Sequence, residues 1–135
     1  MARRVKVLAS VAEQMLEHAR KEAPAECCGL LAGPHDAITE IFPAANASAS
    51  SNEYFIAPQQ LIAAMRSFRE RALNHLGIYH SHPHTENFPS RRDIELAYYP
   101  SCAYFIISLG SSTGRDVRAF AIQGGRVSEF EIETL

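Results

Sequence analysis

The sequence predicts an α/β domain built from one β-sheet, several hairpins and two or three helices. Apolar residues recur at helical spacing in two separate segments, while short apolar or alternating runs bounded by Gly and Pro are typical of strands. The last third of the chain contains three such runs in succession. With 135 residues, 47% of them hydrophobic, the chain is long enough for one packed core, and we expect a single domain over residues 1–135.

The first elements alternate between strand and helix. Valines alternate with basic residues over residues 4–7, which predicts a strand. A helix follows; Ser10 and Glu13 stand at capping-box spacing at its start, and Pro24 limits its end. Its apolar stripe consists of Val11, Met15 and Ala19. Residues 27–33 then predict a buried strand, paired through a turn with a second strand over residues 37–43.

The middle of the chain combines a loop, a helix and a strand. Residues 44–53 are small and polar and predict a mobile loop, followed by a short strand at residues 54–58. The next helix carries a stripe of Leu61, Met65, Phe68 and Ala72. Residues 76–82 predict a strand, residues 83–89 a loop, and Ser90 opens a short helix that reaches about residue 98.

Three strands are expected at the end, over residues 102–109, 116–123 and 126–133, with a hairpin turn at Gly124 and Gly125.

The net charge of −2, from 13 basic and 15 acidic residues, gives no reason to expect a nucleic-acid partner. No apolar run approaches the roughly 20 residues that span a bilayer, and Lys6 interrupts the apolar N-terminal stretch, so we expect neither a membrane segment nor a signal peptide. Three cysteines, an odd number, argue against a disulfide framework and favour a cytoplasmic location.

A cluster of histidines between residues 77 and 93 predicts a metal site. His80 and His82 are two residues apart in a predicted strand, so their side chains share one face and can converge on one ion. Asp93, in the first turn of the following helix, is the best candidate for a third ligand. Ser90 and Asp93 also form an ordinary capping box, which explains both without a metal, although the two interpretations are compatible. His84 is expected at the surface or as a group that supports a ligand.

A hydrolytic metal site also needs a base, and Glu26 is a candidate because it immediately precedes the buried strand. Partial burial would raise its pKa, whereas the alternative is a solvent-exposed glutamate at the start of a strand. Cys27 and Cys28 could be thiolate ligands, nucleophiles or core residues, but adjacent strand residues face opposite ways and cannot both join one site. Cys102 is expected in the core.

These residues resemble a known motif. Glu26-x-x-Gly29, then His80-x-His82-Pro83, Ser90 and Asp93 match the spacing of the JAMM (MPN+) metalloprotease family, and the surrounding segments are similar to its small stand-alone prokaryotic members. The resemblance implies a JAMM-like (cytidine-deaminase-like) fold, a mixed β-sheet or partial barrel flanked by two or three helices.

The resemblance also implies the chemistry, that of a zinc-dependent peptidase or isopeptidase. His80, His82 and Asp93 would bind Zn²⁺, which activates the attacking water. Glu26 would act as the general base and Ser90 would donate a hydrogen bond to the oxyanion. Substrates of the family are ubiquitin-like proteins, in bacteria β-grasp sulfur carriers, and the bond cut would follow their C-terminal Gly-Gly tail. Ser90 can both cap a helix and donate to an oxyanion only if its hydroxyl is shared or switches on substrate binding.

The same resemblance suggests how a substrate is held and which alternatives compete. The loop at 44–53 and the strand at 54–58 would grip the tail, with Tyr54 and Phe55 packing on it, and the short loop at 83–89 favours small ubiquitin-like partners. A non-catalytic MPN-type scaffold and a RadC-like DNA-repair-associated protein are the alternatives; the histidine run lacks the H-x-E and P-C-x-x-C pattern of a deaminase.

Overall fold

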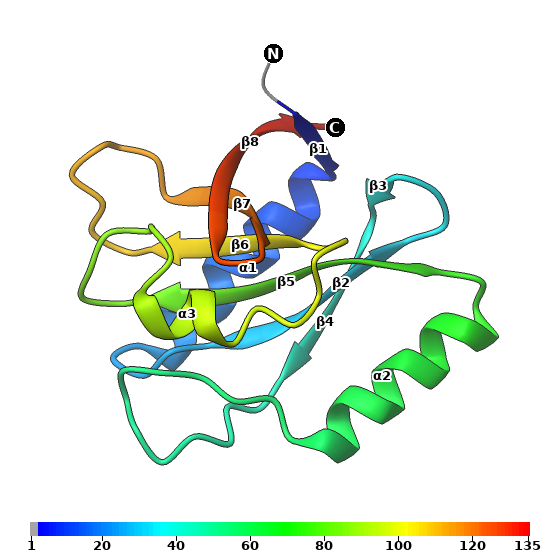
Figure 1. Ribbon diagram of the computed structural model, residues 1–135, viewed down its shortest axis with the longest axis horizontal. Coiled ribbons are helices and arrows are strands. Elements are labelled where there is room, and N and C mark those ends of the chain that lie inside the picture. Colours follow the sequence, from blue (N-terminus) through cyan, green and yellow to red (C-terminus); the bar gives the residue numbers. More distant parts are fainter. Residues whose placement is uncertain (1–2) are drawn as a thin grey trace.

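The computed structural model describes residues 3–135, which form one eight-stranded mixed sheet and three helices (Figure 1). The order of strands across the sheet is β3-β1-β8-β7-β6-β5-β2-β4. The helices are α1 (Ala9–Glu22), α2 (Pro58–Glu70) and α3 (Arg91–Glu95). The strands are β1 (Arg4–Val7), β2 (Cys28–Gly33), β3 (Ala37–Ile38), β4 (Glu40–Ala44), β5 (Asn74–His82), β6 (Ala103–Ser108), β7 (Val117–Gln123) and β8 (Arg126–Thr134).

The sheet curves until its two edges nearly meet. β3 and β4 follow each other in the chain, yet they lie at opposite ends of the strand order, β3 parallel to β1 and β4 antiparallel to β2. Between them, the backbone N–H of Thr39 donates to the carbonyl of Ala32 in β2 at 3.0 Å. The expected partial barrel is thereby confirmed. The prediction of one strand over residues 37–43 was wrong in detail, because Thr39 separates two strands, β3 at one edge of the sheet and β4 at the other.

The two faces of the sheet carry different helices. The predicted stripe of α1 is buried against one face, where alternate strand residues such as Leu31 and Tyr79 meet it. Their neighbours Leu30 and Ile78 point to the opposite face, which packs against α2 through Phe68 and against the segment around α3. Since side chains two residues apart share a face, His80 and His82 lie on the same side as Ile78, the side of α2 and α3.

The crossover between β5 and β6 creates the place for a site. The two strands are parallel, with His80 beside Ile106 and His82 beside Ser108, so the chain must return to the start of β6 after leaving β5. The loop at residues 83–89 and α3 make that return, and Figure 1 shows α3 beside the end of β5. Ligand sites in α/β sheets occur at such carboxyl ends of parallel strands.

Two other local predictions were wrong. Ser10 does not cap α1: the helix begins at Ala9 after Leu8, with no side-chain cap, and the Ala9 N–H is satisfied by the carbonyl of Leu135 at the end of the sheet. Residues 54–58 form no strand, apart from a single bridge between Asn46 and Ile56. The backbone groups of Phe55 are already bonded within the loop, which leaves them unavailable for a ladder.

Other predicted elements are confirmed with small shifts. α1 ends before Pro24, and the α2 stripe is correct except that Ala72 lies past the helix end. α3 is shorter than expected. Gly124 and Gly125 turn the β7–β8 hairpin with φ of 56° and 80°, the left-handed values that favour glycine. All three cysteines are free and buried. Within residues 3–135, no helix has the length and apolar character needed to cross a membrane.

Gly29, the glycine of the Glu26-x-x-Gly29 motif, is predicted to be essential for packing. A Cβ at this position would lie 2.4 Å from Cε1 of the buried Tyr79 ring, far inside contact distance. Gly29→Ala should therefore destabilise the protein by about 1–3 kcal/mol, the usual cost of overpacking. Chemical denaturation measures this, with Gly110→Ala as control, since a Cβ at Gly110 meets nothing within 4 Å. Equal midpoints for the two variants would contradict the packing account.

Candidate metal centre

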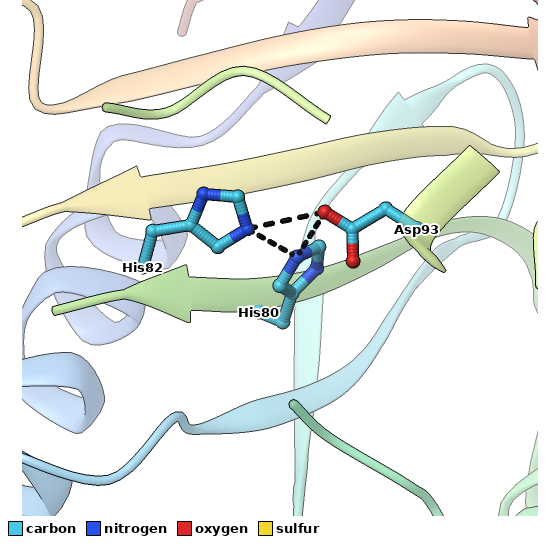
Figure 2. Close-up of side chains that lie close together, drawn as sticks. All are labelled: His80, His82 and Asp93. Carbon is cyan, nitrogen blue, oxygen red and sulfur yellow. Dashed lines mark hydrogen bonds and ion pairs between the residues drawn. The ribbon is translucent and has the colours of Figure 1, made fainter. Parts of the chain in front are cut away.

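His80, His82 and Asp93 converge on one point at the end of β5 (Figure 2). Nε2 of His80 and Nε2 of His82 lie 3.1 Å apart. Asp93 Oδ2 lies 3.3 Å from the first nitrogen and 3.1 Å from the second. The two histidines are almost fully buried, at 1% and 6% exposure, whereas Asp93 is half-buried at the start of α3. The structure therefore brings together all three ligands expected from the sequence.

The spacing and the charge of this group fit a cation. Ligand atoms around a tetrahedral zinc ion with bonds of 2.0–2.1 Å lie about 3.3–3.4 Å from one another. The three observed separations, 3.1, 3.1 and 3.3 Å, need little adjustment to reach that geometry. Two imidazole nitrogens and one carboxylate form a common donor set for divalent transition metals. A potential metal site is thus present.

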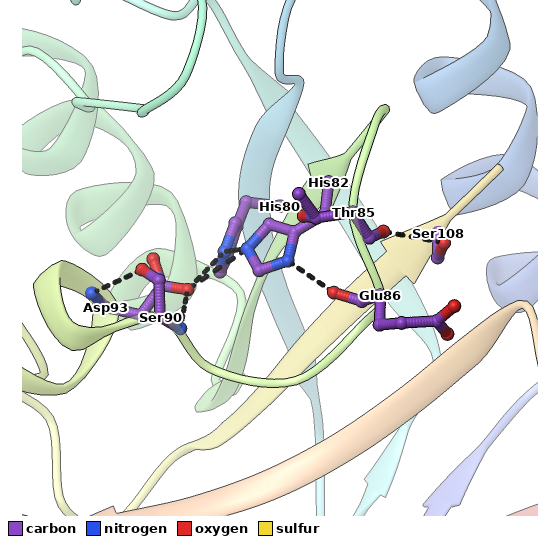
Figure 3. Close-up of polar contacts among 7 residues, drawn as sticks. All are labelled: His80, His82, Thr85, Glu86, Ser90, Asp93 and Ser108. Carbon is purple, nitrogen blue, oxygen red and sulfur yellow. Dashed lines mark hydrogen bonds and ion pairs between the residues drawn. The ribbon is translucent and has the colours of Figure 1, made fainter. Parts of the chain in front are cut away.

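A backbone carbonyl orients His82. Its Nδ1 lies 2.8 Å from the carbonyl oxygen of Glu86 (Figure 3). Because a carbonyl only accepts, Nδ1 carries the hydrogen, so neutral His82 has its lone pair on Nε2, where a metal can bind, and protonated His82 donates from Nε2 to Asp93. Such outer contacts fix the tautomer of metal-binding histidines. The loop that supplies the carbonyl is itself anchored, since the Ser108 hydroxyl donates to the Thr85 carbonyl at 2.9 Å.

Asp93 is held by the capping box that the sequence predicted. The Asp93 N–H donates to Ser90 Oγ at 3.1 Å, and the Ser90 N–H donates to Asp93 Oδ2 at 2.8 Å. The hydroxyl of Ser90 uses only a lone pair in this cap, so its O–H remains able to donate to another group. The capping role and an oxyanion-donor role of Ser90 are therefore compatible without any switch.

The ionisation of the three side chains is mutually dependent. Burial by itself would raise the pKa of Asp93, but hydrogen bonds from the two histidines hold that pKa far below its usual range. Burial also lowers the pKa of His80, and this effect prevails there. For His82, burial is outweighed by the hydrogen bonds to Asp93 and to the Glu86 carbonyl, which raise its pKa. Asp93 is therefore anionic near neutral pH, and its negative charge stabilises a positive charge next to it.

Glu26 is buried beside this group, at 6% exposure, which excludes the alternative of a solvent-exposed glutamate. Burial raises the pKa of its carboxyl group to about 7, and the negative charges of Asp93 and Glu53 add to the effect while His82 opposes it. The side-chain amide of Asn46 donates to the backbone carbonyl of Glu26 at 3.1 Å and fixes the chain there. A carboxyl group poised near neutral pH is suited to general base chemistry.

The remaining sequence candidates lie outside the centre. Cys27 is part of the core cluster against α1, and burial raises the pKa of Cys27 to about 11 and that of Cys28 to about 12. Both thiols therefore stay protonated near neutral pH, which argues against thiolate ligands or nucleophiles. Cys102 is buried, as expected. His84 is exposed, and the group that supports His82 is the Glu86 carbonyl instead.

Three features of the centre were not foreseen. The Glu86 carbonyl is a backbone group, so no pattern of residue types could identify it. Tyr54 was expected to pack on a substrate tail, but its ring stacks on His80, with centroids 4.4 Å apart and planes 23° apart. Asn46 stands in a run of small polar residues and carries no signal of its bonds to Glu26 and Glu53.

Comparisons with known proteins identify the family of the chain. Residues 8–123 match the family described as prokaryotic homologues of the JAB domain. The chain is 33% identical over 125 residues to the CysO-cysteine peptidase of Mycobacterium tuberculosis, covering 91% of this chain and 86% of the relative. It is 34% identical over 112 residues to the desampylase of Haloferax volcanii, covering 78% of this chain and 81% of that protein.

Solved structures place the fold in the same group. The JAB1/MPN domain protein AF2198 from Archaeoglobus fulgidus superposes with a TM-score of 0.69 at 20% identity, over 97% of this chain and 99% of that one. The predicted JAMM-like architecture of a curved mixed sheet with three helices is thereby confirmed for the residues described. With a family match over most of its length and relatives at 33–34% identity, the chain belongs to the prokaryotic JAB/JAMM (MPN) domain family.

Proposed function

We propose that this protein is a zinc-dependent peptidase that hydrolyses the bond after the C-terminal Gly-Gly of a ubiquitin-like sulfur carrier. The observation that carries the proposal is the convergence of His80, His82 and Asp93 with the buried carboxyl group of Glu26 close by. The substrate class is supported by the relatives, one named for the CysO–cysteine linkage and the other as a desampylase. We further propose that residues 1–135 form one domain and that it acts in the cytoplasm, in accord with its free cysteines.

His80, His82 and Asp93 would hold the zinc ion. When bound there, zinc would polarise the scissile carbonyl and lower the pKa of a water molecule toward 7. Because His80 and His82 are almost fully buried, bulk water would not reach the ion from their side. The capping box would keep Asp93 in place while substrate binds and leaves. The donor set and its spacing support zinc.

Glu26 and Ser90 would perform the proton transfer and stabilise charge. Glu26, as carboxylate, takes a proton from the attacking water while the water oxygen bonds to the carbonyl carbon of the last glycine. The same proton then passes to the leaving nitrogen as the C–N bond breaks, which returns Glu26 to its starting state. Ser90 donates its free O–H to the carbonyl oxygen as negative charge develops there.

An apolar pocket of about 250 Å³ beside the metal centre is the proposed path for an extended tail. It shares Tyr54, Arg92 and Leu96 with a much smaller cavity, of about 20 Å³, that lies next to Ser90 and Asp93. Glycines are suited to such a narrow passage, because they let backbone approach closely. The strand edge expected at residues 54–58 is not formed, so the tail cannot pair with the backbone N–H of Phe55, which is bonded to Asn46.

Ser90→Ala should separate the two roles assigned to Ser90. Loss of the oxyanion donor should reduce kcat by about 10²- to 10³-fold. Loss of the helix cap should lower the free energy of unfolding by about 1 kcal/mol, because the Asp93 N–H loses its acceptor. Steady-state kinetics and chemical denaturation measure the two effects. Ser90→Thr keeps a hydroxyl and should recover most of both; a Ser90→Ala enzyme with wild-type kcat would exclude the oxyanion role.

The substrate class is tested with a mixture of ubiquitin-like carriers extended past Gly-Gly by a cysteine or a short peptide. We expect mass spectrometry to show products that end in Gly-Gly, formed only with metal present. Replacing the penultimate glycine by valine should block cleavage, since a β-branched side chain cannot follow the glycine path. Cleavage of an unrelated unstructured peptide with no cleavage of any extended carrier would exclude the substrate class and leave the peptidase assignment intact.

Absence of zinc from the purified protein would instead favour the alternative of a non-catalytic MPN-type scaffold. All three ligands and Glu26 are present in the arrangement described, which supports the enzyme. Metal content of protein purified without chelator therefore discriminates between the two functions. A value close to one zinc ion per chain is expected for the enzyme, and a value near zero for the scaffold.

A further inference from the structure

The two histidines of the centre are supported in different ways. Nδ1 of His82 donates to the Glu86 carbonyl, whereas Nδ1 of His80 is buried and has no hydrogen-bond partner among the residues described. A metal-binding histidine normally has its second nitrogen tied by such a bond, which fixes the ring. Some other contact must set the orientation of His80.

That contact is Tyr54. Its ring lies nearly parallel to the imidazole of His80, with centroids 4.4 Å apart and planes 23° apart. A stacked ring restricts rotation of the imidazole about its bond to Cβ, and aromatic pairs of this kind contribute beyond the area they bury. Tyr54 also lines both the small cavity beside Asp93 and the apolar pocket, together with Arg92 and Leu96.

The loop that carries Tyr54 is clamped on both sides of it. The Asn46 amide group donates to the carbonyl of Glu53 at 2.9 Å and accepts from the N–H of Phe55 at 3.0 Å. The same amide group donates to the carbonyl of Glu26. One side chain therefore joins the residues before and after Tyr54 to the segment of the general base.

A second tie runs from this loop to the third ligand. The carboxylate of Glu53 forms an ion pair with Arg92, the residue directly before Asp93 in α3. The loop is thus held between the Glu26 segment and α3, with the Tyr54 ring directed at His80 between them. Tyr54, which takes no part in the proposed reaction, therefore lies where it can fix the orientation of His80.

We propose that Tyr54, clamped by Asn46, is a positioning residue that holds the His80 ring in its metal-binding orientation in place of the missing hydrogen bond. The inference rests on the metal site of the proposed function. Stacking, and not the hydroxyl group, performs this role, because the ring contacts His80 while Tyr54 Oη has no hydrogen-bond partner in the part of the chain described. Tyr54→Phe should therefore behave as wild type, whereas Tyr54→Leu should not.

Competition with a chromophoric chelator measures zinc affinity without any substrate. We expect Tyr54→Leu to bind zinc about 3- to 10-fold more weakly and Tyr54→Phe to bind within about 2-fold of wild type. Tyr98→Leu is the matched control, since Tyr98 is 70% exposed, and its affinity should not change. The ring current of Tyr54 should also shift the His80 imidazole protons upfield in NMR spectra, in wild type and Tyr54→Phe but not in Tyr54→Leu.

Asn46→Ala provides an independent test if Tyr54→Leu does not fold. Asn46→Ala should weaken zinc binding by a similar factor. The double variant Asn46→Ala/Tyr54→Leu should bind zinc as tightly as Tyr54→Leu alone, because both changes remove the same contact, the stacking of Tyr54 on His80. Wild-type zinc affinity in Tyr54→Leu or, failing that, in Asn46→Ala would overturn the proposal, as would equal losses in Tyr54→Phe and Tyr54→Leu. Failure of wild type to bind zinc would instead overturn the proposed function.

Discussion

Protein carrying His82→Ala is expected to purify with almost no zinc and to show no peptidase activity above background. The change removes one of the three converging ligand atoms. It also removes the hydrogen bond between His82 and the Glu86 carbonyl. Loss of an outer-shell contact alone weakens metal binding 10- to 100-fold, so loss of a ligand should exceed about 100-fold. Metal analysis and chelator competition provide the measurement.

The matched control for this experiment is His84→Ala. His84 stands two residues further along the chain, is exposed, and belongs to the same loop that leaves β5. It should retain the zinc content of wild type. Equal zinc in wild type and His82→Ala would mean that the metal is bound elsewhere, and the assignment of the centre would fail.

Glu26→Gln is expected to keep the fold and the zinc but to lose activity by about 10²- to 10⁴-fold, the usual effect of removing a general base. The amide preserves the size of the buried side chain and cannot accept a proton. Because burial raises the pKa of Glu26 to about 7, the wild-type side chain costs little to protonate and the neutral glutamine should fit the same surroundings. Kinetic assay and metal analysis of the same sample separate the two effects.

Glu70→Gln controls for the loss of one negative charge, since Glu70 is exposed near the end of α2. Its activity should equal that of wild type. A Glu26→Gln enzyme with nearly full turnover would require a different base. Loss of zinc together with activity in Glu26→Gln would indicate a ligand or structural role for Glu26.

The sequence predicted the structure best where residues close together in the chain form a short, regular pattern. The histidine pair could be placed on one face because strand periodicity is two, and Asp93 followed because a capping box fixes the first turn of a helix. The buried stripe of α1 was correct for the same reason. Local periodicity and capping are properties of neighbouring residues, so they can be recognised without the rest of the fold.

Prediction failed where distant segments decide the local structure. The run around Thr39 reads as one strand, but closure of the sheet divides it between two edges. The sequence at the start of α1 predicts a cap by Ser10, yet the carbonyl of Leu135 accepts the hydrogen bond from the Ala9 N–H. Residues 54–58 look extended and apolar, but Asn46 takes the backbone N–H of Phe55 that a ladder would need.

The most direct test of the central claim is a zinc titration of the metal-free protein, followed by assay of cleavage after Gly-Gly in an extended ubiquitin-like carrier. If His80, His82 and Asp93 form the catalytic centre, activity should rise in proportion to added zinc and reach its plateau at one equivalent per chain, while His82→Ala should show no rise. Full activity in the metal-free protein, or the same rise in His82→Ala, would contradict the account.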